Sequence, residues 1–187
     1  MPRPRPLSAR RVPTAAVAAA VALFAAPSAP EAPPPVFVEA STSIVFDEDG
    51  RIGKVRHAWR FDPFYSTFAI QGFDEDANGI LTRAELAPLA EENTSSLAAF
   101  DYFSFLYADG AEKAFSGVNE RWLEYDPEIR QLTLYFELEV ADPVDPFAHE
   151  IILDVFDPAY FVDFSMYPER PFSLVDAPAA CGIVNQT

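Results

Sequence analysis

The sequence has only one cysteine and two histidines among its 187 residues. A single cysteine excludes a disulfide within the chain, and one cysteine with two histidines is too few for a zinc finger or an iron–sulfur cluster. The sequence also has no nucleophile elbow, no phosphate-binding loop and no zinc-protease motif. We therefore expect a protein that is not an enzyme.

Basic residues are scarce as well: 13 lysines and arginines face 29 aspartates and glutamates, for a net charge of −16. Four of the arginines lie in residues 1–28, which contain no acid, so the rest of the chain has 9 basic and 29 acidic residues, or −20. Such a surface repels nucleic acid and anionic membranes and attracts cations. Half of the residues are apolar, with 17 Phe and 7 Tyr, which indicates a packed core.

No apolar run is long enough to be a typical membrane span. The run Thr14 to Ala26 has 13 residues, against the roughly 20 that a spanning helix needs. It follows four arginines and precedes the small residues Ala26-Pro27-Ser28, a pattern typical of a signal peptide over residues 1–28. An uncleaved anchor is the alternative. We expect a periplasmic or secreted protein without membrane insertion after cleavage, a Pro-rich linker over 29–35, and one domain over 36–187.

The most specific pattern is the twelve-residue stretch from Asp74 to Glu85, which matches D-x-[DN]-x-[DN]-G-x5-E at every specified position. Ca²⁺ prefers six to eight oxygen ligands, and Gly79 stands where such a loop turns sharply. The predicted ligands are the side chains of Asp74, Asp76, Asn78 and Glu85, the backbone carbonyl of Ile80, and Thr82 through a water molecule. Thr82 and Glu85 also form a capping box. The alternative is a solvated acidic turn.

Periodicity predicts an α+β fold, in which an antiparallel β-sheet of hairpins carries an EF-hand-like helix-loop-helix segment, residues 62–101, after its first hairpin. The predicted helices are 64–73 and 83–101, the second bent at Pro88. The alternation Leu132, Leu134, Phe136, Leu138 predicts a buried face, with Thr133, Glu137 and Glu139 on the opposite face. The predicted strands are 36–46, 51–61, 103–107, 111–118, 121–125, 131–140, 150–156, 160–166 and 172–175.

Several longer blocks carry a family resemblance. They are Val36–Ala40, Arg56–Asp62, Phe68–Asp74, Ala84–Asn93, Asp101–Phe103 and Asp157–Phe164. Over about Val36 to Cys181 the chain resembles the bacterial "domain of unknown function 1007" family, described as the periplasmic component of an uncharacterised ABC-type transport system. The resemblance implies an association with nickel/cobalt-type metal-ion transport and, as partner, a metal permease or the membrane component of an ABC transporter.

One departure from that family concerns transition metals. Many members have His-Pro-His just before the first block, where this chain has Pro33-Pro34-Pro35. Because both imidazoles are absent, we carry no nickel or zinc site onto this chain. The leading hypothesis is an exported, non-enzymatic Ca²⁺-binding accessory protein. The alternatives are a transition-metal substrate-binding component of a transporter and, third, a hydrolase whose site the sequence hides.

The two histidines and the cysteine have simpler explanations. We expect His57 to be a hydrogen-bonded strand residue beside an aromatic core, although a His–carboxylate pair with Asp62 would suit acid–base chemistry or metal binding. His149 is expected at the surface, and Cys181 to be buried and inert. Ser66 and Ser104 have no His/Asp context in the sequence.

Overall fold

The computed structural model describes residues 35–184. The predicted signal peptide, 1–28, and all of the predicted linker except Pro35 lie outside the described residues. None of the helices in the described part of the chain is both long and apolar enough to span a membrane.

The first hairpin is the one that the sequence predicts. Strand β1 (Val36–Phe46) pairs antiparallel with β2 (Ile52–Phe61). The turn between them is closed by the carboxylate of Asp47, which accepts hydrogen bonds from the backbone N–H groups of Asp49 (3.0 Å) and Arg51 (2.8 Å). Gly50 has a φ of +75°, a conformation that glycine adopts without steric strain. The Asp-Gly signal therefore marks the turn correctly.

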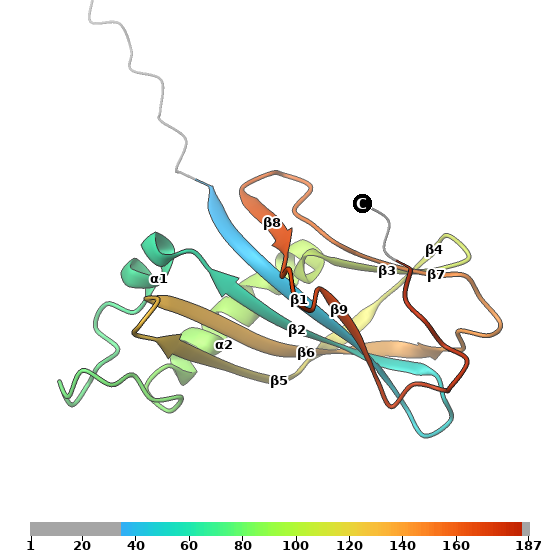
Figure 1. The fold of residues 1–187 in the computed structure, drawn as a ribbon, viewed down its shortest axis with the longest axis horizontal. Helices are drawn as coiled ribbons and strands as arrows, with labels where there is room; N and C mark the ends of the chain where they lie inside the picture. The colour runs from blue at the N-terminus through green and yellow to red at the C-terminus, as the bar shows by residue number, and fades with distance from the viewer. Residues whose placement is uncertain (1–34, 185–187) are drawn as a thin grey trace, which may run out of the picture. The chain divides into compact units, whose positions relative to one another are not determined.

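The main sheet has the order β5-β6-β2-β1-β8, and β9 also pairs with β1 (Figure 1). Its remaining strands are β5 (Phe115–Asp126), β6 (Gln131–Val144), β8 (Val162–Met166) and β9 (Phe172–Val175). Within the series β5-β6-β2-β1 each adjacent pair is antiparallel, but β8 and β9 both run parallel to β1. The prediction of a purely antiparallel sheet was wrong for β8 and β9. Alternation of apolar and polar residues indicates a strand, but it does not indicate which strand is its neighbour or whether the two run parallel.

A second sheet of three strands has the order β4-β3-β7. Strand β3 (Ser104–Ala108) pairs antiparallel with β4 (Ala111–Lys113) and with β7 (Ile151–Val155). The sequence predicted one return strand over 111–118. The structure divides it, because β4 ends at Lys113 and the chain enters the main sheet as β5 at Phe115.

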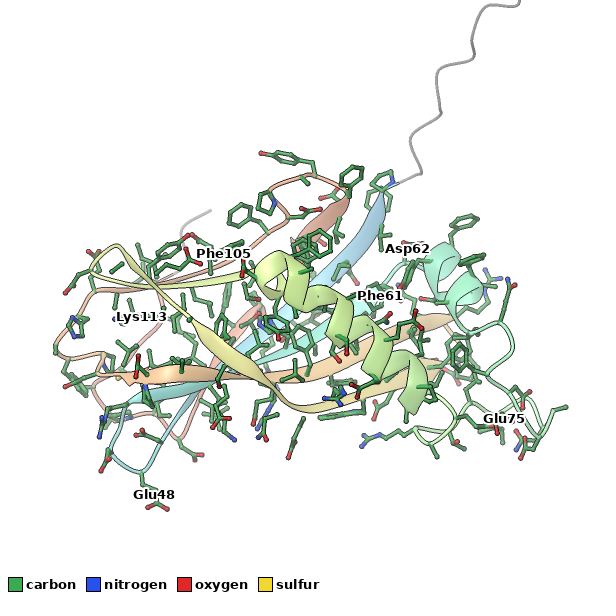
Figure 2. All side chains as sticks on the ribbon, turned by 180° about the vertical axis from the view of Figure 1, so that it is seen from behind. Glu48, Phe61, Asp62, Glu75, Phe105 and Lys113 are labelled. Atoms are coloured by element: carbon green, nitrogen blue, oxygen red, sulfur yellow. The ribbon has the colours of Figure 1, made fainter. Side chains whose placement is uncertain are left out.

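Both helices are shorter than predicted. Helix α1 (Pro63–Ala69) ends before Gly72, whose φ of +86° does not continue a right-handed helix. Helix α2 (Ala87–Leu97) has Pro88 in its first turn, where a missing N–H breaks no intrahelical bond. Pro88 therefore starts the helix and does not bend it. A 3₁₀ segment (Ala98–Phe103) follows, and α2 lies across one face of the main sheet, packed on β5 (Figures 1 and 2).

The core lies between α2, β3 and the main sheet. The predicted buried face of β6 is confirmed, since Leu132, Leu134, Phe136 and Leu138 are fully buried. Trp59 of β2 packs edge-on against Phe136, with ring centroids 4.8 Å apart. The fold is thus α+β, with mixed sheets and two α-helices in the described residues.

Glu137 corrects the prediction for the opposite face of β6. Its side chain is only 3% exposed, covered by Lys54 and Arg56 of β2. Lys54 Nζ donates to its carboxylate at 2.7 Å, Arg56 donates two hydrogen bonds, and Asn119 Nδ2 donates at 3.1 Å. Burial by itself would raise the pKa of Glu137, but these donors outweigh it and lower the pKa to about 2. The alternation of apolar and polar residues predicts the face of β6 on which Glu137 lies correctly, but the long side chains of Lys54 and Arg56 bury Glu137 on that face.

Candidate functional site

The predicted ligand residues lie in the connection between α1 and α2. In its first half, the loop folds around its own acidic side chains. Asp74 accepts hydrogen bonds from the backbone N–H groups of Asn78 (3.1 Å) and Gly79 (2.9 Å). Asn78 Oδ1 in turn accepts the N–H of Ile80 at 2.6 Å. Gly79 has a φ of +79°, so a residue tolerant of positive φ is required at this turn.

The second half contains the predicted capping box. The N–H of Glu85 donates to Thr82 Oγ1 at 3.2 Å, and the N–H of Thr82 donates to Glu85 Oε2 at 2.9 Å. The other oxygen of Glu85 accepts the N–H of Glu75 at 3.2 Å, which joins the two ends of the loop. The hydrogen bonds from Thr82, and then those from Glu75 and Asp76, lower the pKa of Glu85. Glu85 is therefore held as a carboxylate.

Three of the predicted ligands converge. Carboxylate oxygens of Asp74, Asp76 and Glu85 all lie within 4.8 Å of one another. Asn78 adjoins them, because its Nδ2 donates to Asp76 at 2.7 Å. Within residues 35–184, this is the only group of three or more His, Cys, Asp or Glu side chains so close together, and no Lys or Arg forms an ion pair with it.

The remaining two predicted ligands have different surroundings. The hydroxyl of Thr82 donates to Glu85 at 2.7 Å, beside the acidic group. The side chain of Ile80 is 67% exposed, which agrees with a position where only the backbone carbonyl is needed. The ends of the loop are anchored, since Phe73 and Leu81 pack on the hydrophobic core and Leu86 is fully buried. An exposed polar loop is therefore held at both ends by apolar contacts.

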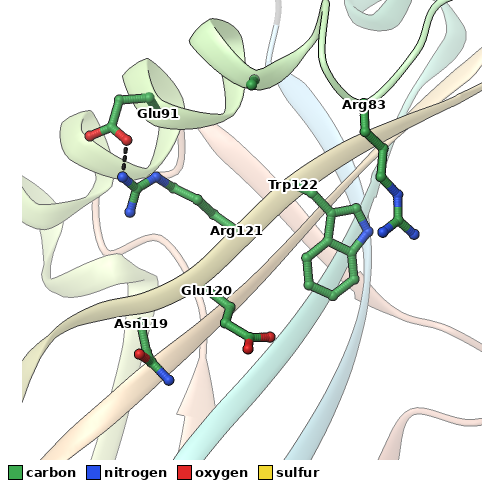
Figure 3. A pocket seen from close by; sticks show the side chains of 7 residues that line it. Arg83, Glu91, Asn119, Glu120, Arg121 and Trp122 are labelled. Carbon is green, nitrogen blue, oxygen red and sulfur yellow. Dashed lines mark hydrogen bonds and ion pairs between the residues drawn. The ribbon is translucent and has the colours of Figure 1, made fainter.

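A cleft that sequence reasoning missed borders this loop (Figure 3). It has a volume of about 530 Å³ and is lined by Arg83, Ala87, Glu91, Asn119, Glu120, Arg121 and Trp122. The guanidinium of Arg83 lies 5.0 Å from the ring centroid of Trp122 and pairs with Glu124. Arg121 pairs with Glu91 across the cleft. These residues come from separate parts of the chain, so no local sequence pattern predicts the cleft.

His57 is the hydrogen-bonded strand residue that we expected. It is fully buried and stacks on Phe136 at 4.8 Å. Ser104 Oγ donates to the carbonyl of Tyr102 (2.9 Å), so it accepts from His57 Nε2–H at 3.1 Å. Thr42 Oγ1 then donates to Nδ1 at 3.1 Å. Burial lowers the pKa of His57 to about 3. Sequence reasoning missed Ser104 as a partner, because 47 residues separate the two.

The other singled-out residues lie apart from this network. Asp62 makes no pair with His57; its carboxylate caps α1 by accepting the N–H groups of Phe64 and Tyr65. His149 is exposed, as predicted, and Nδ1 lies 2.8 Å from Asp109. Cys181 is half-buried beside the smaller hydrophobic cluster, so the prediction of a buried thiol was wrong.

A family model described as "Protein of unknown function (DUF1007)" matches residues 18–186. This is longer than the stretch Val36 to Cys181 that carried the resemblance in the sequence. No curated protein and no solved structure matches the chain.

Proposed function

The chain belongs to the DUF1007 family, and we propose that it is an exported, non-enzymatic protein that binds Ca²⁺ at the loop Asp74–Glu85. The single observation that carries the proposal is the convergence of three carboxylates within 4.8 Å without a basic partner among the described residues. Like charges this close repel one another, so a cation in their midst lowers the free energy of the folded loop.

The donor set fits a hard cation. Asp74, Asp76 and Glu85 offer carboxylate oxygens and Asn78 an amide oxygen, and the backbone carbonyl of Ile80 completes an oxygen-only set. A bound Ca²⁺ would supply positive charge that neutralises these carboxylates. Glu85 closes the loop, because its carboxylate already reaches both Thr82 and Glu75. The side chains of Asp74 and Asn78 hold the first turn by accepting backbone N–H groups.

A transition-metal carrier, the first alternative, would need softer donors. The two histidines do not join the acidic group: His57 is buried between Thr42 and Ser104, and His149 lies beside Asp109. The hydrolase alternative has a Ser104–His57 contact, but both side chains are buried away from substrate. The association with nickel/cobalt-type transport, and with a permease or ABC-transporter membrane component, is proposed from the family resemblance alone. In that setting the loop would have a structural or sensing role.

A thermal melt tests the calcium site. We expect Ca²⁺, added to protein treated with EDTA, to raise the Tm. Extracytoplasmic calcium sites have Kd values of about 10⁻⁴–10⁻³ M, and Ca²⁺ at about ten times Kd stabilises by about 1.4 kcal/mol. For a domain of this size the Tm rises by roughly 3–6 °C.

Two variants make the assignment specific. Glu85→Gln should abolish the rise, whereas Glu75→Gln, the matched change at a position of the same loop that is not a predicted ligand, should retain it. No rise with Ca²⁺, or an equal rise in Glu85→Gln, would show that the loop is only a solvated turn. A rise with Ni²⁺, Co²⁺ or Zn²⁺ but not with Ca²⁺ would favour the transition-metal carrier.

A further inference from the structure

Four aromatic side chains stand exposed where β1 begins, a group that we call the aromatic patch. They are Phe37 (51% exposed), Phe64 (78%), Tyr160 (87%) and Phe161 (62%). Hydrogen bonds of the backbone bring the segments that carry these side chains together. The N–H of Val36 donates to the carbonyl of Phe161 at 3.1 Å, and the carboxylate of Asp62 accepts the N–H groups of both Phe37 and Phe64. Figure 2 shows Asp62 between α1 and the start of β1.

A shallow groove of about 330 Å³ opens within the same surface. Phe37, Pro63, Asp163 and Ser165 are among the residues that line it. Phe37 of β1 and Asp163 of β8 are register partners. Phe161 comes two residues before Asp163, so the groove adjoins the loop that carries Tyr160 and Phe161. No ion pair engages Asp163 within residues 35–184. The ring of Tyr160 therefore projects beside a groove in which the carboxylate of Asp163 is available as a hydrogen-bond acceptor.

The projecting loop is rigidly braced. Asp157 is buried, and its carboxylate accepts the N–H groups of Ala159 (2.7 Å), Phe161 (2.9 Å) and Val162 (2.9 Å). Tyr160 has a φ of +58°, a conformation that is unfavourable for a residue other than glycine and persists where the surroundings enforce it. A loop fixed in this way loses little conformational entropy when it docks.

We propose that the aromatic patch is the interface with a second copy of this chain, in which Tyr160 of each copy enters the groove of the other. A projection and a hollow on one face are what a two-fold interface requires, because each contact then occurs twice. The Tyr160 hydroxyl would donate to Asp163 of the opposite copy. An anionic bilayer and a second copy both repel a domain with about 20 net negative charges, but only a second copy offers a groove for the Tyr160 ring and the Asp163 carboxylate as an acceptor for its hydroxyl.

The exposed area is of the right size. The four side chains together expose nearly as much surface as three whole aromatic side chains, or about 550 Å² at roughly 200 Å² each. A standard interface buries about 800 Å² per partner, so the patch and the walls of the groove approach that area. The patch alone is already near the upper end of what monomers expose as one apolar surface.

Sedimentation velocity of the purified protein measures the association. We expect a dimer whose dissociation constant falls as salt is raised, because screening weakens the repulsion between two acidic copies while the apolar contact remains. Phe161→Ser should weaken the dimer at least tenfold, as loss of an aromatic anchor does. The control is Phe147→Ser, which removes a ring that is also 62% exposed but lies between β6 and β7, and which should leave the dimer unchanged.

A mixing experiment tests the swapped geometry. Tyr160→Ser removes the projecting ring and Ser165→Phe fills the groove, so each variant alone should be monomeric. When the two variants are mixed, Tyr160 of the Ser165→Phe variant can still enter the groove of the Tyr160→Ser variant. We therefore expect a mixed dimer that is tighter than the dimer of either variant alone. A cooperative thermal transition in each variant would show that both fold.

Three results would overturn the proposal: a wild-type monomer at all concentrations and salts, equal weakening by Phe147→Ser, or no gain on mixing. Flotation with vesicles of zwitterionic lipid by a monomeric protein would show that the patch faces lipid and not a second copy.

Discussion

Replacing Glu137 by glutamine removes a carboxylate that lies buried beneath the side chains of Lys54 and Arg56 on the main sheet. Lys54, Arg56 and Asn119 all donate to it. Its pKa falls from the ordinary 4.5 to about 2. Because the folded pKa lies below the unfolded one, the carboxylate stabilises the fold above about pH 4.5, and this stabilisation disappears as the pH falls toward 2.

The size of the expected loss of stability follows from the difference between the unfolded and folded pKa values of Glu137. A fall from 4.5 to about 2 corresponds to about 3.4 kcal/mol at neutral pH. Lys54 and Arg56 are 36% and 42% exposed, so solvent screening reduces the contribution to about 2 kcal/mol. At about pH 3, with the same reduction, roughly 1 kcal/mol remains. Glu137→Gln should therefore lower the free energy of unfolding by about 2 kcal/mol at pH 7 and by about half that at pH 3.

Urea unfolding of wild type and variant at both pH values measures these differences. Glu139→Gln is the matched control, because Glu139 follows two residues later on β6 and is exposed; it should change stability by less than about 0.5 kcal/mol. Comparing variants removes the effect of the other carboxylates, which titrate in both proteins. If Glu137→Gln is as stable as wild type at pH 7, or if the deficit does not shrink at low pH, the ion-pair account is wrong.

Two further predictions concern polar groups at the first hairpin and α1. His57 should remain neutral down to about pH 5, because its pKa is about 3, and NMR of the imidazole measures its protonation. Because the pKa in the folded state lies below the ordinary 6.5, the neutral ring stabilises the fold above pH 6.5, and this stabilisation is lost as the pH falls. Protonation of His57 in the folded protein near pH 6 would contradict the buried network. Asp62→Ala should destabilise by about 1 kcal/mol through loss of the α1 cap, whereas Asp62→Asn, which can still accept hydrogen bonds, should lose much less; equal losses in denaturant unfolding would show that charge and not capping matters.

The local chemistry of the turns was predictable from the sequence. Asp47 and Gly50 mark the first hairpin because their side chain and backbone requirements are satisfied within five residues. For the same reason the spacing of Asp74, Gly79 and Glu85 anticipates a loop that folds around its own carboxylates. Alternation likewise identified the buried residues of β6, since successive side chains of a strand point to opposite faces.

Contacts between distant segments could not be predicted in this way. That β8 and β9 run parallel to β1, that Lys54 and Arg56 bury Glu137, and that Ser104 meets His57 all depend on which strands become neighbours. No periodicity within a single sequence indicates which strands become neighbours. Local turns, strand faces and the composition of the acidic loop could be predicted, because they depend on residues close together in the sequence. The buried polar networks, the cleft beside Arg83 and the aromatic patch could not be predicted, because the packing of distant strands creates them.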